Sequence, residues 1–354
     1  MHSPRILAAL VATAAITGHT TAQTTVQGEP FGYVKLNIVA GTGAAKKSTL
    51  LSIPLLDEAG IAGKATGRIT GVASNSITAA GAGWTVGQLS AASAPHLIEI
   101  TSGAAQGRLF LISTATANTT ETVAIAQEEA TRVGDLRNLG IAMGAETGDT
   151  YRIRPVDTLS SFFGTPQSTL IQGGTSASNA DTIAIVVNGS SATYFYHTTL
   201  GRWTRVSLSQ EDASNTPIPP YAGVRYERLA NTPLQFTVTG KVPSGQRKVS
   251  VKSSGSTMLS PYWPVSMTLA QLAIQNITNW VKASTSTNAD TLSLTAGGSA
   301  TAFFHDGSNW RRVALGNPLA NTNVVPVGAS IQINKKGRAS GYAEYTNAAP
   351  YNLQ

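Results

Sequence analysis

The stretch "RPVDTLSSFFGTPQSTLIQGGTSASNADTIAI" runs from Arg154 to Ile185 and returns in altered form as "WPVSMTLAQLAIQNITNWVKASTSTNADTLSL" from Trp263 to Leu294. Both versions carry Pro-Val, then Thr-Leu, then Asn-Ala-Asp-Thr ahead of an apolar run. Asn179 and Asn288 lie 109 residues apart. A repeat of roughly 100 residues has the size of a domain, so the pattern predicts tandem β modules rather than a solenoid of short units.

The repeat continues into "YFYHTTLGRWTRVSL" at Tyr194–Leu208 and "FFHDGSNWRRVAL" at Phe303–Leu315. Asp306-Gly307 between two alternating runs is a strong β-hairpin signal, because glycine tolerates positive φ. Thr198–Gly201 fills the same place in the first copy. Each segment therefore predicts a hairpin with a histidine near the end of one strand and a tryptophan near the start of the next.

Short alternating or apolar runs bounded by Gly, Pro, Asn or Ser dominate the rest of the chain. The clearest predicted strands are 33–39, 97–102, 108–114, 122–126, 151–156, 182–187, 235–242 and 330–335. Helical spacing is scarce: Ser266–Val281 is the best helix candidate, and Thr158–Gly164 is a shorter one. We expect an all-β protein of tandem β-sandwich or barrel-like modules with one short helix per module.

Four segments follow from these patterns. Residues 1–22 predict a signal peptide, with Arg5 before an apolar stretch at Ile6–Ile16 and a small-residue cleavage site ending at Ala22. Residues 149–250 and 251–354 are predicted as the two repeat modules, and residues 23–148 as an N-terminal β domain. "WTVGQL" at Trp84–Leu89 resembles "MTLAQL" at Met267–Leu272, which makes this domain a candidate for a third, divergent copy.

The composition sets limits on compartment and partners. The chain has 354 residues, no cysteine, 12% charged residues and a formal net charge of +7. Thiol catalysis and disulfides are excluded, and the scattered basic residues do not form the dense patch that nucleic-acid binding requires. After the signal segment no stretch reaches the roughly 20 apolar residues of a membrane helix. We expect a secreted protein, extracellular or in the cell envelope, with self-association or a surface polysaccharide as its partner and no membrane span.

Several blocks together resemble a family of secreted, β-rich bacterial repeat proteins with no assigned activity. They are "FGYVKLNIVAGTG…LSIPLL", "EITSGAAQGRLFLIS", "GDTYRIRPVDTLSSFFG" and the "NADT…YFYH…GRWTRV" segment. The resemblance covers most of the chain after residue 22. It implies export and a β-rich fold, and it supplies no catalytic residues.

Two groups of side chains invite a chemical interpretation. His305 with Asp306 could suggest a general base, but neighbouring residues on a strand point to opposite faces, and the first copy has Thr198 in place of the aspartate. Asp181 and Asp290, in the two Asn-Ala-Asp-Thr stretches, fit a fragment of a calcium loop with no closing glutamate, so an Asx turn is the better interpretation. We therefore predict no catalytic residues, no metal site and no cofactor.

A ligand-contact role remains open for the tryptophan, arginine and histidine of each hairpin. The candidate residues are His197, Trp203, Arg205, His305, Trp310 and Arg312. The sequence thus predicts a secreted, non-enzymatic structural or adhesive protein of the cell surface. The alternative is a carbohydrate-binding protein that uses exposed aromatic side chains of the repeat hairpins.

Overall fold

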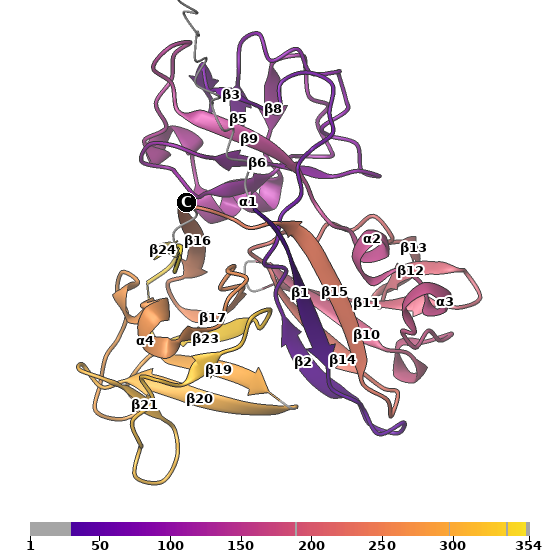
Figure 1. The fold of residues 1–354 in the computed structure, drawn as a ribbon, viewed down its shortest axis with the longest axis vertical. Coiled ribbons are helices and arrows are strands. Elements are labelled where there is room, and N and C mark those ends of the chain that lie inside the picture. Colours follow the sequence, from indigo (N-terminus) through magenta and orange to yellow (C-terminus); the bar gives the residue numbers. More distant parts are fainter. Residues whose placement is uncertain (1–29, 188–189, 297, 338, 352–354) are drawn as a thin grey trace, which may run out of the picture.

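The computed structural model describes residues 30–187, 190–296, 298–337 and 339–351. The predicted signal peptide at 1–22 lies outside these residues. Strands dominate and the helices are short, so the predicted β-rich class is confirmed. Three hydrophobic cores support three groups of strands, which Figure 1 shows as one upper lobe and two lower sheets.

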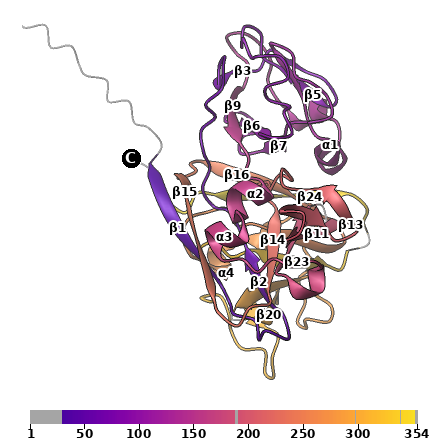
Figure 2. The same cartoon turned by 90° about the vertical axis from the view of Figure 1, so that its right-hand side faces the viewer.

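The lower right of Figure 1 holds a six-stranded sheet, called the first sheet below, in the order β13-β12-β11-β10-β14-β2. Its strands are β2 (Lys47–Leu51), β10 (Thr182–Val187), β11 (Ser190–His197), β12 (Arg202–Arg205), β13 (Leu208–Asp212) and β14 (Gly223–Arg228). A two-stranded ribbon of β1 (Phe31–Ile38) and β15 (Leu234–Lys241) packs on the same core. Figure 2 shows this ribbon along the outer side of the molecule.

The lower left of Figure 1 holds a five-stranded sheet, called the second sheet below, in the order β17-β23-β19-β20-β21. Its strands are β17 (Gly255–Leu259), β19 (Thr291–Ala296), β20 (Ser299–His305), β21 (Trp310–Arg312) and β23 (Ile331–Lys335). Its ribbon consists of β16 (Gln246–Lys252) and β24 (Tyr342–Ala348), and β18 (Met267–Thr268) pairs with β22 (Val324–Val325).

The two lower sheets follow the same order of pairing. β2-β14-β10-β11-β12 in one corresponds to β17-β23-β19-β20-β21 in the other, and the ribbon β1-β15 corresponds to β16-β24. The loops correspond as well: the backbone N–H of Leu159 donates to Thr216 O at 3.1 Å, and that of Leu269 donates to Asn323 O at 2.9 Å.

These pairings cross the domain boundaries predicted from the sequence. β1 and β2 belong to the predicted domain 23–148, yet their partners β15 and β14 lie within 149–250. β16 crosses the predicted boundary between residues 250 and 251, and it pairs along its whole length with β24 at the end of the chain. Strand pairing is non-local, so a boundary drawn from local resemblance does not reveal it.

In the order of the chain, the upper lobe comes after β2 and before the helix at Leu159–Phe163. It has a sheet in the order β3-β9-β6-β7 and a smaller one in the order β4-β5-β8. The strands are β3 (Thr66–Arg68), β4 (Gly71–Val72), β5 (Ser76–Thr78), β6 (His96–Ile100), β7 (Leu109–Leu111), β8 (Thr122–Ala124) and β9 (Thr150–Pro155). The helix α1 (Gln127–Val133) and the 3-10 turn Leu136–Leu139 complete the lobe.

Both predicted helical segments contain a helix, but the helix within Ser266–Val281 is much shorter than predicted. α2 (Leu159–Phe163) begins at a Thr158 capping box and is followed by α3 (Pro166–Thr169). Within the predicted helix Ser266–Val281 only α4 (Leu269–Leu272) is α-helical, followed by the 3-10 turn Ile274–Asn276. Ala273 has φ 53°, a left-handed conformation that ends the helix.

The edge strands of the two lower sheets pack on each other's sheets, β2 against β19 and β17 against β10. Backbone hydrogen bonds join them at corresponding places. Ser52 N–H, just after β2, donates to Gly328 O at 2.8 Å, and Ser260 N–H, just after β17, donates to Tyr221 O at 3.4 Å. The joint therefore has an approximate two-fold character.

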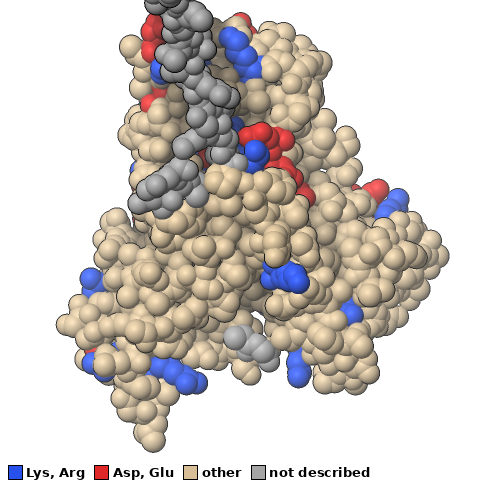
Figure 3. All heavy atoms as spheres, viewed as in Figure 1, with Lys and Arg blue, Asp and Glu red and all other residues tan. Residues whose placement is uncertain are grey.

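Among the described residues no helix is both long and apolar enough to cross a membrane. Figure 3 shows that most of the visible face carries neither acidic nor basic side chains, and that the basic ones are scattered. This agrees with the low charged fraction of the chain.

Candidate functional site

The two hairpins place their tryptophans inside the protein. Trp203 is 2% exposed and Trp310 is 1% exposed, and they belong to different hydrophobic cores. The indole N–H of Trp203 donates to Gly164 O at 2.9 Å, just after α2, and that of Trp310 donates to Gln275 Oε1 at 3.2 Å. Each indole thus ties its hairpin to the neighbouring helical segment and offers no exposed face for a ligand to stack on.

The predicted hairpins are confirmed, but their histidines are not structurally equivalent. His305 lies opposite Trp310, with ring centroids 5.5 Å apart. In the first hairpin Tyr196 lies opposite Trp203, and His197 is one position further along. A one-residue shift moves a side chain to the other face of a strand, so the repeated histidine of the sequence is not a repeated site.

His305 forms no base-and-orienter pair with Asp306. Its Nδ1 accepts a hydrogen bond from Gly307 N–H at 3.1 Å, while burial lowers the pKa of its imidazole. Asp306 lies in the turn, where it accepts from Ser308 N–H at 2.8 Å and pairs with Arg311 at 2.7 Å. The carboxylate shapes the turn.

Asp181 and Asp290 each join three segments of chain. Asp181 is buried and accepts from the N–H groups of Gln172 and Leu229, both at 2.8 Å, and pairs with Arg228 Nη1 at 2.6 Å. In the second sheet a buried aspartate, Asp290, again accepts backbone hydrogen bonds and lies near a basic side chain, Lys335.

The carboxylate of Asp290 accepts from Val281 N–H at 2.9 Å and from Lys336 N–H at 2.7 Å. Lys335 Nζ lies 3.8 Å from it. The aspartate of the Asn-Ala-Asp-Thr motif is therefore a buried structural acceptor. The sequence predicted a local turn and did not reveal these long-range partners.

A buried ionic network joins the upper lobe to the ribbon of the second sheet. Glu99 on β6 pairs with Arg154 Nε at 2.6 Å and also with Arg247 on β16. Burial by itself would raise the pKa of Glu99, but the charges of Arg247 and Arg154 outweigh it and lower the pKa to about 2.

A second connection joins the lobe to the first sheet. Glu129 on α1 is fully buried, pairs with Arg132, and accepts a hydrogen bond from the Tyr221 hydroxyl. The Arg132 guanidinium lies 4.4 Å from the centre of the Tyr221 ring. Burial raises the pKa of Glu129, and the charge of Arg132 opposes this shift.

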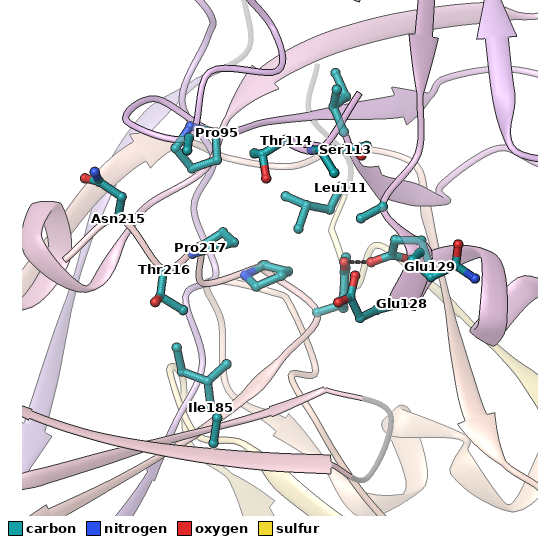
Figure 4. A pocket seen from close by; sticks show the side chains of 18 of the residues that line it. Pro95, Leu111, Ser113, Thr114, Glu128, Glu129, Ile185, Asn215, Thr216 and Pro217 are labelled. Atoms are coloured by element: carbon teal, nitrogen blue, oxygen red, sulfur yellow. Dashed lines mark hydrogen bonds between the residues drawn. The ribbon is translucent and has the colours of Figure 1, made fainter. Parts of the chain in front are cut away.

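Beside this connection lies a cavity of about 510 Å³ between the upper lobe and the first sheet. In Figure 4 Pro95, Leu111 and Thr114 line one wall, and Glu128 and Glu129 lie at another. The remaining labelled side chains around it are Ser113, Ile185, Asn215, Thr216 and Pro217. The first sheet adds Tyr194 and Arg205.

Of the six side chains predicted to contact a ligand, Arg205 alone lines this cavity. It lies opposite Tyr194 in the strand register and is exposed. Arg312 holds the corresponding place opposite Phe303 and is also exposed, but it does not line the cavity. Sequence reasoning missed the other lining residues, because they come from short stretches scattered between Ala92 and Tyr221 and form no motif.

Within the part of the chain that the structure describes, no group of three or more His, Asp or Glu side chains is placed to hold a metal ion. No protein-family model, curated protein or solved structure matches this chain.

Proposed function

We propose that this protein is a secreted, non-enzymatic structural or adhesive protein of the cell surface, built from two copies of one β unit. The first copy consists of residues 31–56 and 156–242, and the second of residues 243–351. The upper lobe, residues 57–155, is inserted in the first copy between its second strand and its helix. The shared order of strand pairing and the two-fold character of the joint support this division.

The upper lobe fits the same plan in part. Its strand order β3-β9-β6-β7 matches the first four positions of the larger sheets, with β3 in the place of β2 and β9 in the place of β14. This supports the divergent third copy that the sequence suggested, at 57–155 and not over the whole of 23–148.

The observation that carries the structural role is the ribbon of β1 and β15. The two strands form a sheet of their own, so among the residues that the structure describes no further strand pairs with the outer edge of β1. Phe31 and Tyr33 on β1 are 66% and 70% exposed. A long strand edge with exposed aromatic side chains is a template for pairing with another chain.

The test is sedimentation velocity of residues 23–354 over a wide range of concentrations. The proposal expects higher oligomers whose population rises with concentration. Phe31→Lys with Tyr33→Lys should weaken this association, because charge on an edge strand opposes pairing. Thr346→Lys, at an exposed position of the other ribbon, is the matched control. A protein that stays monomeric throughout contradicts the proposal.

The second candidate function is carbohydrate binding, and one observation favours it. The cavity between the lobe and the first sheet combines apolar rings with charged and amide side chains. The buried Trp203 and Trp310 do not support this function, so the candidate rests on the cavity and not on the hairpin indoles.

A further inference from the structure

We propose that the cavity between the upper lobe and the first sheet binds a short, uncharged oligosaccharide. The inference rests on the carbohydrate-binding candidate and gives it a site. It does not depend on the structural role of the β1 ribbon.

The cavity has the dimensions of a ligand site. Its volume of about 510 Å³ falls within the roughly 300–1,000 Å³ typical of small-molecule pockets. It also lies at the junction of two structural units, where such pockets concentrate. The buried contact of Tyr221 with Glu129 closes one side and fixes the position of the lobe.

The walls offer two kinds of surface. Pro217 is partly exposed and, together with the largely buried Pro219 and Tyr194, gives this wall apolar surface of the kind that packs against the C–H face of a sugar ring. Arg205 and Glu128 bring a planar donor and a planar acceptor to the same space. Sugar hydroxyls both donate and accept, so one ligand can accept from the Arg205 guanidinium and also lie beside the Glu128 carboxylate.

The charges argue against other ligands. An acyl chain would cover the Arg205 guanidinium without giving it hydrogen bonds, which costs free energy. A strongly anionic ligand would face the exposed carboxylate of Glu128, and a cationic one would face Arg205. An uncharged polyhydroxyl compound avoids both conflicts.

Two pairs of variants isolate the cavity. Ala115 lines it and is exposed, so Ala115→Trp should fill the space at small cost to folding. Ala117, on the same loop and exposed, does not line it, and Ala117→Trp is the control. Arg205→Ala removes the donor, and Arg312→Ala makes the same change at the corresponding place of the second sheet.

The probe is a printed array of neutral mono- to tetrasaccharides, followed by calorimetric titration of the strongest hit into residues 23–354. We expect a hit whose Kd rises at least about tenfold in Ala115→Trp and Arg205→Ala, a loss of about 1.4 kcal/mol or more, and is unchanged in both controls. A thermal melt of each variant confirms that it is folded.

Two results would overturn the proposal. The first is an array without any hit, and the second is a hit that Ala115→Trp and Arg205→Ala leave unchanged. The second result would still leave carbohydrate binding elsewhere on the protein. Sedimentation of Ala115→Trp separates the structural role, because that variant should lose the sugar and keep its self-association.

Discussion

Asp181 and Arg228 form a buried ion pair across two segments of the first sheet, with Arg228 Nη1 2.6 Å from Asp181 Oδ2. Both side chains are about 3% exposed. The second sheet places Asp290 and Lys335 in the corresponding positions. The motif that is most visible in the sequence is therefore a structural joint used twice.

Asp181→Asn should lower the free energy of unfolding by about 3 kcal/mol or more. The new amide NH2 would face N–H groups that now donate to the carboxylate, and Arg228 would be buried without its counter-charge. Asp290→Asn should have a similar effect in the second sheet. Urea denaturation monitored by circular dichroism measures both changes. Asp212→Asn, at an exposed carboxylate, is the control and should cost below about 1 kcal/mol. Equal small losses in all three variants would refute the joint.

Glu99 makes stability depend on pH in acid. Its folded pKa of about 2 lies below the ordinary value of 4.5, so it stabilises the fold above pH 4.5 and loses this contribution as the pH falls toward 2. The shift corresponds to roughly 3 kcal/mol. We expect the difference in unfolding free energy between the wild type and Glu99→Gln to shrink between pH 6 and pH 2.5. A difference that is the same at both values would contradict the buried network.

All five tryptophans are buried, which fluorescence can check directly. They are Trp84, Trp203, Trp263, Trp280 and Trp310. We expect emission at short wavelength and weak quenching by iodide, since the indoles do not meet the solvent. Quenching close to that of the urea-unfolded chain would show that the indoles are accessible, as an exposed stacking platform would require.

The register of the two hairpins predicts that the buried position of His305 tolerates a tyrosine. His305 faces Trp310 at the position where Tyr196 faces Trp203, so His305→Tyr places in the second sheet the residue that the first sheet already uses. The loss in unfolding free energy should stay below about 1.5 kcal/mol. His305→Asp, which buries a charge beside the indole, should cost more than about 2 kcal/mol. Thermal or urea unfolding that ranks the two variants the other way would contradict this register.

The sequence predicted the local features well. The alternating run at 151–156 became β9, and Asp306-Gly307 became the predicted turn, because alternation and turn chemistry act over a few neighbouring residues. The predicted helix Ser266–Val281 was found only in part, as α4 (Leu269–Leu272), because the left-handed conformation of Ala273 ends it.

The non-local features could not be predicted in the same way. The pairing of Tyr33 with Thr239 joins strands at opposite ends of the first copy, and no short pattern encodes it. The first hairpin has one more residue between its histidine and its tryptophan than the second, so His197 and His305 align in the sequence but not in the strand register. The cavity lined by Arg205 forms where the upper lobe packs against the first sheet, and no local pattern in the sequence encodes that packing.

The central claim is that β1 completes the first unit by pairing with β15 across the inserted lobe. The chain has no cysteine, so an engineered pair reports on this contact without interference. Tyr33 and Thr239 lie directly opposite each other, at a separation that a disulfide can span. The control is Tyr33→Cys with Thr346→Cys, which places one cysteine on β1 and the other on β24 of the other ribbon.

Mild oxidation of the Tyr33→Cys, Thr239→Cys variant, followed by peptide mass spectrometry, is the most direct test. We expect nearly complete formation of the intramolecular disulfide between residues 33 and 239, and almost none in the control pair. Failure of the first pair to form, under conditions where the protein is folded, would contradict the pairing and restore residues 23–148 as an independent N-terminal domain.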